Sequence, residues 1–212
     1  MDHDGDLDYV ATNIGRNTRY GQPDERHPIR IYYGQFFDGG LPKIVEAHYE
    51  GERLVPMRGL NVSAMAIPEL KEKFRTHRAY AGATLEEIYT AKSLKDAQAF
   101  ETNTCDSGVF INDGNINDGP GASGEPTFHF KPLALAAQFG PGFGVVCSDL
   151  DGDGNADIYL VQNQRSTHPE LAPLDGAVSQ LLLGDGRGDF APVEPRRSGL
   201  IEPGDAKACM LA

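Results

Sequence analysis

The sequence lacks several features that would place it in a familiar class. It contains no tryptophan and only three cysteines in 212 residues. These cysteines, Cys105, Cys147 and Cys209, show no CxxC spacing and cannot all pair within the chain, so they leave the redox compartment undecided. No run of 18 apolar residues occurs, and we therefore expect no membrane span. The length also exceeds that of a disulfide-stapled miniprotein.

Basic residues are scarce as well. The chain has 19 Lys and Arg against 31 Asp and Glu, which gives a formal net charge of −12 and an isoelectric point near 4.8. Such a field repels phosphate backbones and anionic lipids, so we expect no nucleic-acid partner. Glycine and proline are abundant, with 25 and 14 residues, and this abundance indicates many turns.

The familiar signatures of catalysis are missing. The six histidines include no HExxH pair, and Ser123 follows Ala122 rather than standing in a GxSxG turn. The glycines of residues 184–188 do not match GxGxxG. We therefore predict that the chain is not an enzyme.

The residue pattern divides the chain into three segments. Residues 1–60 contain β-branched and aromatic stretches separated by turns, which predicts strands. Residues 61–103 carry Ala, Leu, Glu and Lys at helical spacing, and we interpret them as a helical insertion. Residues 104–212 return to the strand pattern.

Two details of the helical insertion can be predicted. Thr84 followed by Glu87 matches a capping box, so we expect a short helix to begin after Thr84. A further helix is expected over residues 93–100.

A strand, turn and strand arrangement occurs twice in the third segment. The two examples comprise residues 108–114, 115–125 and 127–130, and residues 178–183, 184–189 and a strand led by Phe190. Self-similarity of this kind is typical of repeat architectures. The tripeptide RGD at residues 187–189 lies in the second turn, and we assign it to that turn rather than to adhesion.

The segment with the clearest chemistry is residues 149–157, which read DLDGDGNAD. Oxygen donors stand at positions 1, 3, 5, 7 and 9, and a glycine at position 6 permits the tight turn that wraps a hard cation. We predict a Ca²⁺ site in which Asn155 offers its backbone carbonyl and the other residues their carboxylates. The candidate ligands are Asp149, Asp151, Asp153, Asn155 and Asp157.

An incomplete second copy stands at the N-terminus. Aligned on positions 3, 5, 7 and 9 of the first loop, its candidate ligands are Asp2, Asp4, Asp6 and Asp8. Position 1 would precede Met1, so this loop lacks one donor and we expect weaker binding. Residues 35–43 repeat the glycine turn, but Phe37 and Lys43 replace carboxylates, and we expect no metal there.

Residues 149–157 have two other interpretations. An EF-hand requires a carboxylate at position 12 and flanking helices, whereas Leu160 occupies position 12 and both flanks are strand-like, so the EF-hand is rejected. An Asp/Gly turn without a metal is the alternative that stays open.

These residues resemble the FG-GAP and VCBS repeats of calcium-binding β-propellers of the integrin-α-like class. Phe143 and Gly144 match the FG half, although residues 161–163 replace the GAP half. Residues 13–20 are similar to the NxGxNxxY stretch that follows a VCBS loop, and residues 183–190 to the LGDGxGxF hairpin. The chain also resembles bacterial secreted proteins that carry such repeats, often with an ASPIC/UnbV-type region.

The resemblance implies an all-β chain that forms a partial β-propeller of about three blades, with a small α-helical insertion. Residues 1–60 and 104–212 would form blades, with a truncated loop at the N-terminus. A strand from Lys207 would begin a truncated C-terminal blade.

The resemblance also implies a function. Calcium would be structural in a module for extracellular binding or scaffolding, with a protein or glycan as partner. The location would be extracellular, periplasmic or on the cell surface, with the signal peptide absent from this fragment. The alternative function is a hydrolase or lyase with a pocket near the helical insertion.

Overall fold

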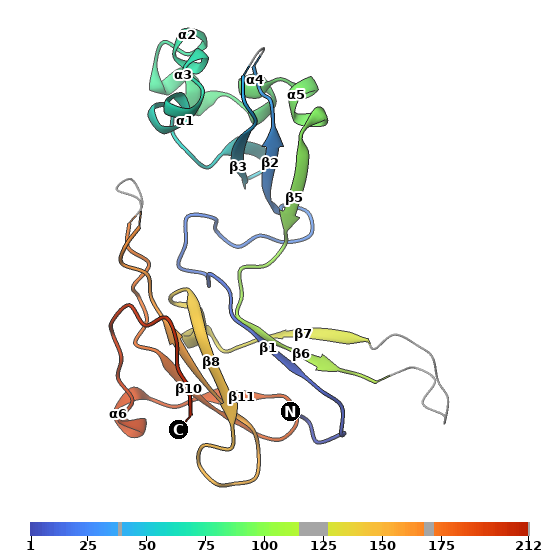
Figure 1. Ribbon diagram of the computed structural model, residues 1–212, viewed down its shortest axis with the longest axis vertical. Helices are drawn as coiled ribbons and strands as arrows, with labels where there is room; N and C mark the ends of the chain where they lie inside the picture. The colour runs from blue at the N-terminus through green and yellow to red at the C-terminus, as the bar shows by residue number, and fades with distance from the viewer. Residues whose placement is uncertain (38–39, 115–126, 168–171, 212) are drawn as a thin grey trace. The chain divides into compact units, whose positions relative to one another are not determined.

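The computed structural model describes residues 1–37, 40–114, 127–167 and 172–211. The chain forms two compact units (Figure 1). The first, here the discontinuous unit, combines Met1–Thr18 with Cys105–Ala212, and the second, here the inserted unit, is Arg19–Thr104. The expected excursion at residues 115–125 lies outside the described residues.

In the part that the structure describes, the discontinuous unit forms two antiparallel sheets. Their strand orders are β1-β6-β7 and β11-β10-β9-β8. The strands are β1 Tyr9–Ala11, β6 Gly108–Asn112, β7 Phe128–Pro132, β8 Gly142–Ser148, β9 Asp157–Gln162, β10 Gln180–Gly184 and β11 Phe190–Pro192. The described residues of this unit also form two short helices, η1 Leu135–Gln138 and α6 Pro195–Ser198. Its core joins strands of both sheets through Val109, Ile111, Leu133, Ala137, Ile158, Leu160 and Leu182.

The strand expected from Lys207 is not formed, and this prediction is wrong. The segment instead packs against β8, where a Cβ added to Gly144 would lie 2.9 Å from the Cα of Ala208. The Lys207 Nζ donates to the Asn163 carbonyl at 2.7 Å and lies 3.4 Å from the centre of the Phe143 ring. Side-chain contacts rather than a backbone ladder therefore hold this segment.

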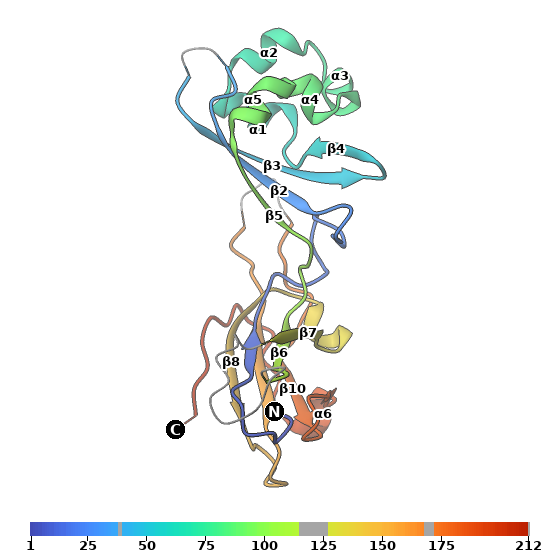
Figure 2. The same ribbon diagram turned by 90° about the vertical axis from the view of Figure 1, so that its right-hand side faces the viewer.

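The described residues of the inserted unit form one antiparallel sheet and five helices. The sheet order is β4-β3-β2-β5, formed by β2 Ile29–Gly34, β3 Lys43–Glu50, β4 Arg53–Pro56 and β5 Gln98–Thr102. The helices are α1 Leu60–Ala66, α2 Glu69–Lys73, α3 His77–Gly82, α4 Leu85–Tyr89 and α5 Ala91–Asp96. Figure 2 shows them gathered on one side of the sheet. The core includes Leu70, Leu85 and Ile88 from the helices, and Tyr32, Val45 and Ala47 from the sheet.

The structure refines the expected helical insertion. Thr84 and Glu87 form the predicted capping box before α4, which confirms that detail. The helix expected over residues 93–100 is wrong beyond Asp96, because Gln98–Thr102 pairs with β2. The helices share their core with β2 and β3, so a boundary at residue 60 does not separate two compact units.

The described residues are mainly β, with three antiparallel sheets and 31% strand against 19% helix. Among the described residues no sheet closes on itself. No helix in this part of the chain is both long and apolar enough to cross a bilayer.

The capping box makes a stability prediction for the inserted unit. Thr84→Ala removes the hydroxyl that accepts from the Glu87 backbone N–H, so we expect a loss of about 1 kcal/mol in the free energy of unfolding. Urea denaturation measures this change. Replacement of the exposed Thr127 by alanine is the matched control, and an equal loss there would contradict the capping role.

Candidate metal site

The candidate site lies in the turn of the β8–β9 hairpin. Ser148 and Asp157 are the last paired residues of the two strands, so residues 149–156 form the connection. Gly152 and Gly154 adopt φ angles of 83° and 92°, a region that glycine enters without steric cost. The glycines therefore allow the chain to reverse direction tightly enough for its carboxylates to converge.

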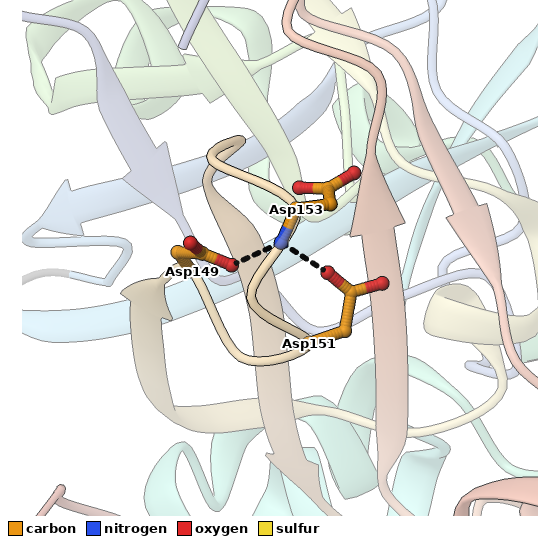
Figure 3. A group of neighbouring side chains, drawn as sticks. All are labelled: Asp149, Asp151 and Asp153. Atoms are coloured by element: carbon orange, nitrogen blue, oxygen red, sulfur yellow. Dashed lines mark hydrogen bonds between the residues drawn. The ribbon is translucent and has the colours of Figure 1, made fainter.

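Three of the predicted ligands converge in this turn. Carboxylate oxygens of Asp149, Asp151 and Asp153 lie within 4.8 Å of one another, and all three residues are exposed (Figure 3). At that separation, each pair of negative charges repels by roughly 1 to 3 kcal/mol between water-like and surface-like dielectric. A divalent cation among them would remove this repulsion.

Hydrogen bonds to the backbone hold the three carboxylates in place. Asp149 accepts from the backbone N–H groups of Gly152 at 2.7 Å, Asp153 at 3.1 Å and Gly154 at 3.0 Å. The Asp153 N–H also donates to Asp151 at 3.1 Å, and Figure 3 shows both bonds of this donor. The turn is thus organised around its own acidic side chains.

Asn155 orients the third carboxylate. Its backbone N–H and its side-chain amide donate to the two oxygens of Asp153 at 2.8 and 2.9 Å. These bonds stabilise the charged form and lower the pKa of Asp153 below its ordinary value. An ionised carboxylate is the form that a hard cation binds.

Asp157 differs from the other predicted ligands because it is fully buried. One of its oxygens accepts from the Leu150 N–H at 2.8 Å and the other from the Gly184 N–H at 2.9 Å. It therefore ties the start of the turn and the end of β10 to β9. The structure does not group it with the three converging carboxylates, and its ligation of a metal stays a prediction.

Asp8 makes the same contacts in the N-terminal segment. One of its oxygens accepts from the Met1 nitrogen and the other from the Asn112 N–H at 2.9 Å. In the alignment of the two acidic loops, Met1 corresponds to Leu150. Asn112 likewise corresponds to Gly184. Asn112 is the last residue of β6 and pairs with Phe128, the first residue of β7, and Gly184 is the last residue of β10 and pairs with Phe190, the first residue of β11.

The other predicted ligands of the N-terminal loop, Asp2, Asp4 and Asp6, do not show the arrangement of the β8–β9 turn. The Asp4 N–H donates to Asp2 at 3.4 Å and the Asp6 N–H donates to Asp4 at 2.9 Å. Within the described residues, the only acidic group with three ligand atoms inside 4.8 Å is that of the β8–β9 turn. No three carboxylates of Asp2, Asp4, Asp6 and Asp8 meet this criterion, and metal binding by this loop stays a prediction.

His3 contacts Asn155 of the β8–β9 turn, a contact that the sequence does not predict. Its Nε2 lies 3.0 Å from the Oδ1 of Asn155, so the N-terminal loop meets the β8–β9 turn. A hollow of about 360 Å³ between the two loops is lined by Met1, His3, Gly5, Asp6, Asp149, Gly154, Asn155 and Ala156. No local signal reveals this contact, because the residues are 152 positions apart.

The whole net charge of the chain belongs to the unit that holds this site. The inserted unit has 12 Lys and Arg and 12 Asp and Glu, so its formal charges balance. The discontinuous unit has 7 Lys and Arg against 19 Asp and Glu. This excess attracts cations toward the turn.

The donor set tests whether the turn fits calcium. The converging groups are all carboxylates, and hard cations such as Ca²⁺ take oxygen ligands, whereas Zn²⁺ sites are rich in His and Cys. The residues present therefore fit a hard divalent cation. Comparison of the chain with protein-family models, with curated proteins and with solved structures found no match in any of the three.

Proposed function

We propose that the chain is a calcium-binding module in which the ion is structural. The observation that supports this proposal is the convergence of Asp149, Asp151 and Asp153 in a turn held by backbone hydrogen bonds. Calcium bound there would connect the ends of β8 and β9. Because the ion would bind the folded turn and not the unfolded chain, its binding would stabilise the discontinuous unit.

We further propose that the discontinuous unit is part of a β-propeller of the FG-GAP and VCBS kind. The matching roles of Asp8 and Asp157 support this, because each ties its loop to the strand that follows in its own sheet. The sheets β1-β6-β7 and β9-β10-β11 then correspond strand by strand. In this proposal the module binds an extracellular protein or glycan, or serves as a scaffold, and is not an enzyme.

Direct measurement of binding tests the calcium proposal. Isothermal titration of the chelated chain with Ca²⁺ is expected to show saturable binding, with a Kd of about 0.1 to 1 mM as in extracellular calcium modules. Asp151→Asn retains the shape of the side chain but removes one charge, so we expect at least a tenfold weaker Kd.

The matched control is Asp185→Asn. Asp185 is exposed and accepts from the backbone N–H groups of Arg187 and Asp189 in another turn, outside the acidic group. We expect this variant to bind calcium as the parent chain does. Absence of saturable binding to the parent chain, or equal weakening by both substitutions, would contradict the proposal.

A further inference from the structure

The side chain of Asn155 contacts two segments that are far apart in the sequence. Its amide nitrogen Nδ2 donates to the Oδ2 of Asp153 at 2.9 Å, and its Oδ1 lies 3.0 Å from the Nε2 of His3. Asp153 is one of the converging carboxylates of the β8–β9 turn, whereas His3 belongs to the N-terminal loop. Asn155 therefore connects the N-terminal loop to the proposed calcium ligands.

The chemistry of the amide fixes the direction of both hydrogen bonds. An ionised carboxylate only accepts, so the NH₂ end of Asn155 faces Asp153. The oxygen end then faces His3, and because an amide oxygen also only accepts, the His3 ring donates from its Nε2–H. The two bonds hold the amide at both ends. Without the donor on His3, the amide would be held at the Asp153 end alone.

The β10–β11 turn, residues 185–189, packs over the same hydrogen bond. A Cβ added to Gly186 would lie 2.4 Å from the Oδ1 of Asn155 and 2.9 Å from the Nε2 of His3. A methyl group at this position would therefore displace one of the two partners. The contact between His3 and Asn155 is thus enclosed by a third segment of the chain, and it is not an isolated surface contact.

We propose that His3 is a positioning residue for the calcium site and acts through Asn155. The inference rests on the proposed function and deepens it. By holding the amide oxygen, His3 keeps the amide hydrogens directed at Asp153, and this carboxylate keeps its place beside Asp149 and Asp151. His3 is not itself a ligand in this proposal, because Ca²⁺ takes oxygen donors.

The coupling acts in both directions. Groups that orient metal ligands raise the affinity for the metal, because the ligands rearrange less when the ion binds. By linkage, an ion that holds Asp153 in place also favours the contact between Asn155 and His3. Calcium bound in the β8–β9 turn would therefore help to order the N-terminal loop.

Isothermal titration of the chelated full chain with Ca²⁺ tests this proposal with two variants of His3. His3→Leu keeps the bulk but removes the N–H, so we expect a Kd about three- to tenfold weaker, the change that one hydrogen bond supplies. His3→Gln restores an N–H donor at its Nε2, and its Kd is expected to stay within about twofold of that of the parent chain. His77→Leu, at an exposed histidine of the inserted unit, is the matched control and should bind as the parent does.

Gly186→Ala tests the same contact from the β10–β11 turn. Its methyl group would meet Asn155 and His3, so weaker calcium binding is expected. Gly199→Ala is the matched control. The φ angles of the two glycines are 69° and 73°, so both substitutions strain the backbone alike, but a Cβ at Gly199 would meet no atom of the described residues within 4 Å. Gly199→Ala is therefore expected to leave the Kd unchanged.

The NMR signals of the Asn155 side-chain amide report the contact in chelator, without the ion. They are expected to shift in His3→Leu and to stay near their parent positions in His3→Gln, and circular dichroism establishes that each variant is folded. A parent chain that binds no calcium would overturn both this proposal and the proposed function. Calcium binding by the parent with an unchanged Kd in His3→Leu, or equal weakening in His3→Leu and His3→Gln, would overturn this proposal alone.

Discussion

Addition of about 10 mM Ca²⁺ to the chelated chain is expected to raise the melting temperature of the discontinuous unit by roughly 5 to 15 °C. At about ten to a hundred times its Kd, the ion stabilises the folded state by about 1.4 to 2.7 kcal/mol, which corresponds to such a shift in a unit of this size. The physical source is the relief of repulsion among Asp149, Asp151 and Asp153. Differential scanning calorimetry with and without chelator measures the shift.

Asp153→Ala is expected to abolish most of this gain. The substitution removes one converging carboxylate and the acceptor for the Asn155 donors. Asp185→Asn, outside the acidic group, is the control and should retain the full shift. Equal melting temperatures of the parent chain in calcium and in chelator would contradict a structural calcium site. Magnesium in place of calcium is expected to give a smaller shift, because Mg²⁺ requires stricter geometry and loses its water less readily.

Asp157→Ala is expected to lower the free energy of unfolding by about 2 to 4 kcal/mol, even in chelator. The side chain is fully buried, and its loss leaves the N–H groups of Leu150 and Gly184 without their acceptors. Urea denaturation of the calcium-free chain measures the change. The chelator matters because it separates this structural role from any part that Asp157 has in binding an ion.

Two further variants sharpen this experiment. Asp157→Asn keeps one oxygen acceptor, so its loss should be intermediate between the parent chain and Asp157→Ala. Asp8→Ala removes the acceptor for the Asn112 N–H and is expected to destabilise the same unit. A calcium-free Asp157→Ala chain as stable as the parent would contradict the structural role of this carboxylate.

Much of the local structure could be predicted from the sequence because it depends on neighbouring residues. The capping box of Thr84 and Glu87 involves residues three positions apart, and it forms as expected. The turn at residues 149–157 likewise follows from its alternating carboxylates and glycines, and three of the predicted ligands converge. In both places the contacts that specify the structure lie within one short segment.

The errors arose where a segment is specified by a distant partner. Gln98–Thr102 shows no strong alternation of apolar and polar residues. It is a strand because its backbone pairs with that of β2. The segment after Lys207 has a strand-like composition, yet it is held by contacts with Phe143 and Asn163. Local pattern does not contain the energy of the long-range contacts that decided either segment.

The sequence by itself determined the acidic turn, its oxygen-only chemistry and the excess of negative charge, because these are properties of residue type and spacing. Only the tertiary structure decided which of the carboxylates are exposed and therefore accessible to an ion from solution. Burial turned Asp157 into an acceptor for two backbone N–H groups, while Asp149, Asp151 and Asp153 remained exposed. The tertiary structure also brought His3 to Asn155, since these residues are 152 positions apart and only the fold places their loops in contact.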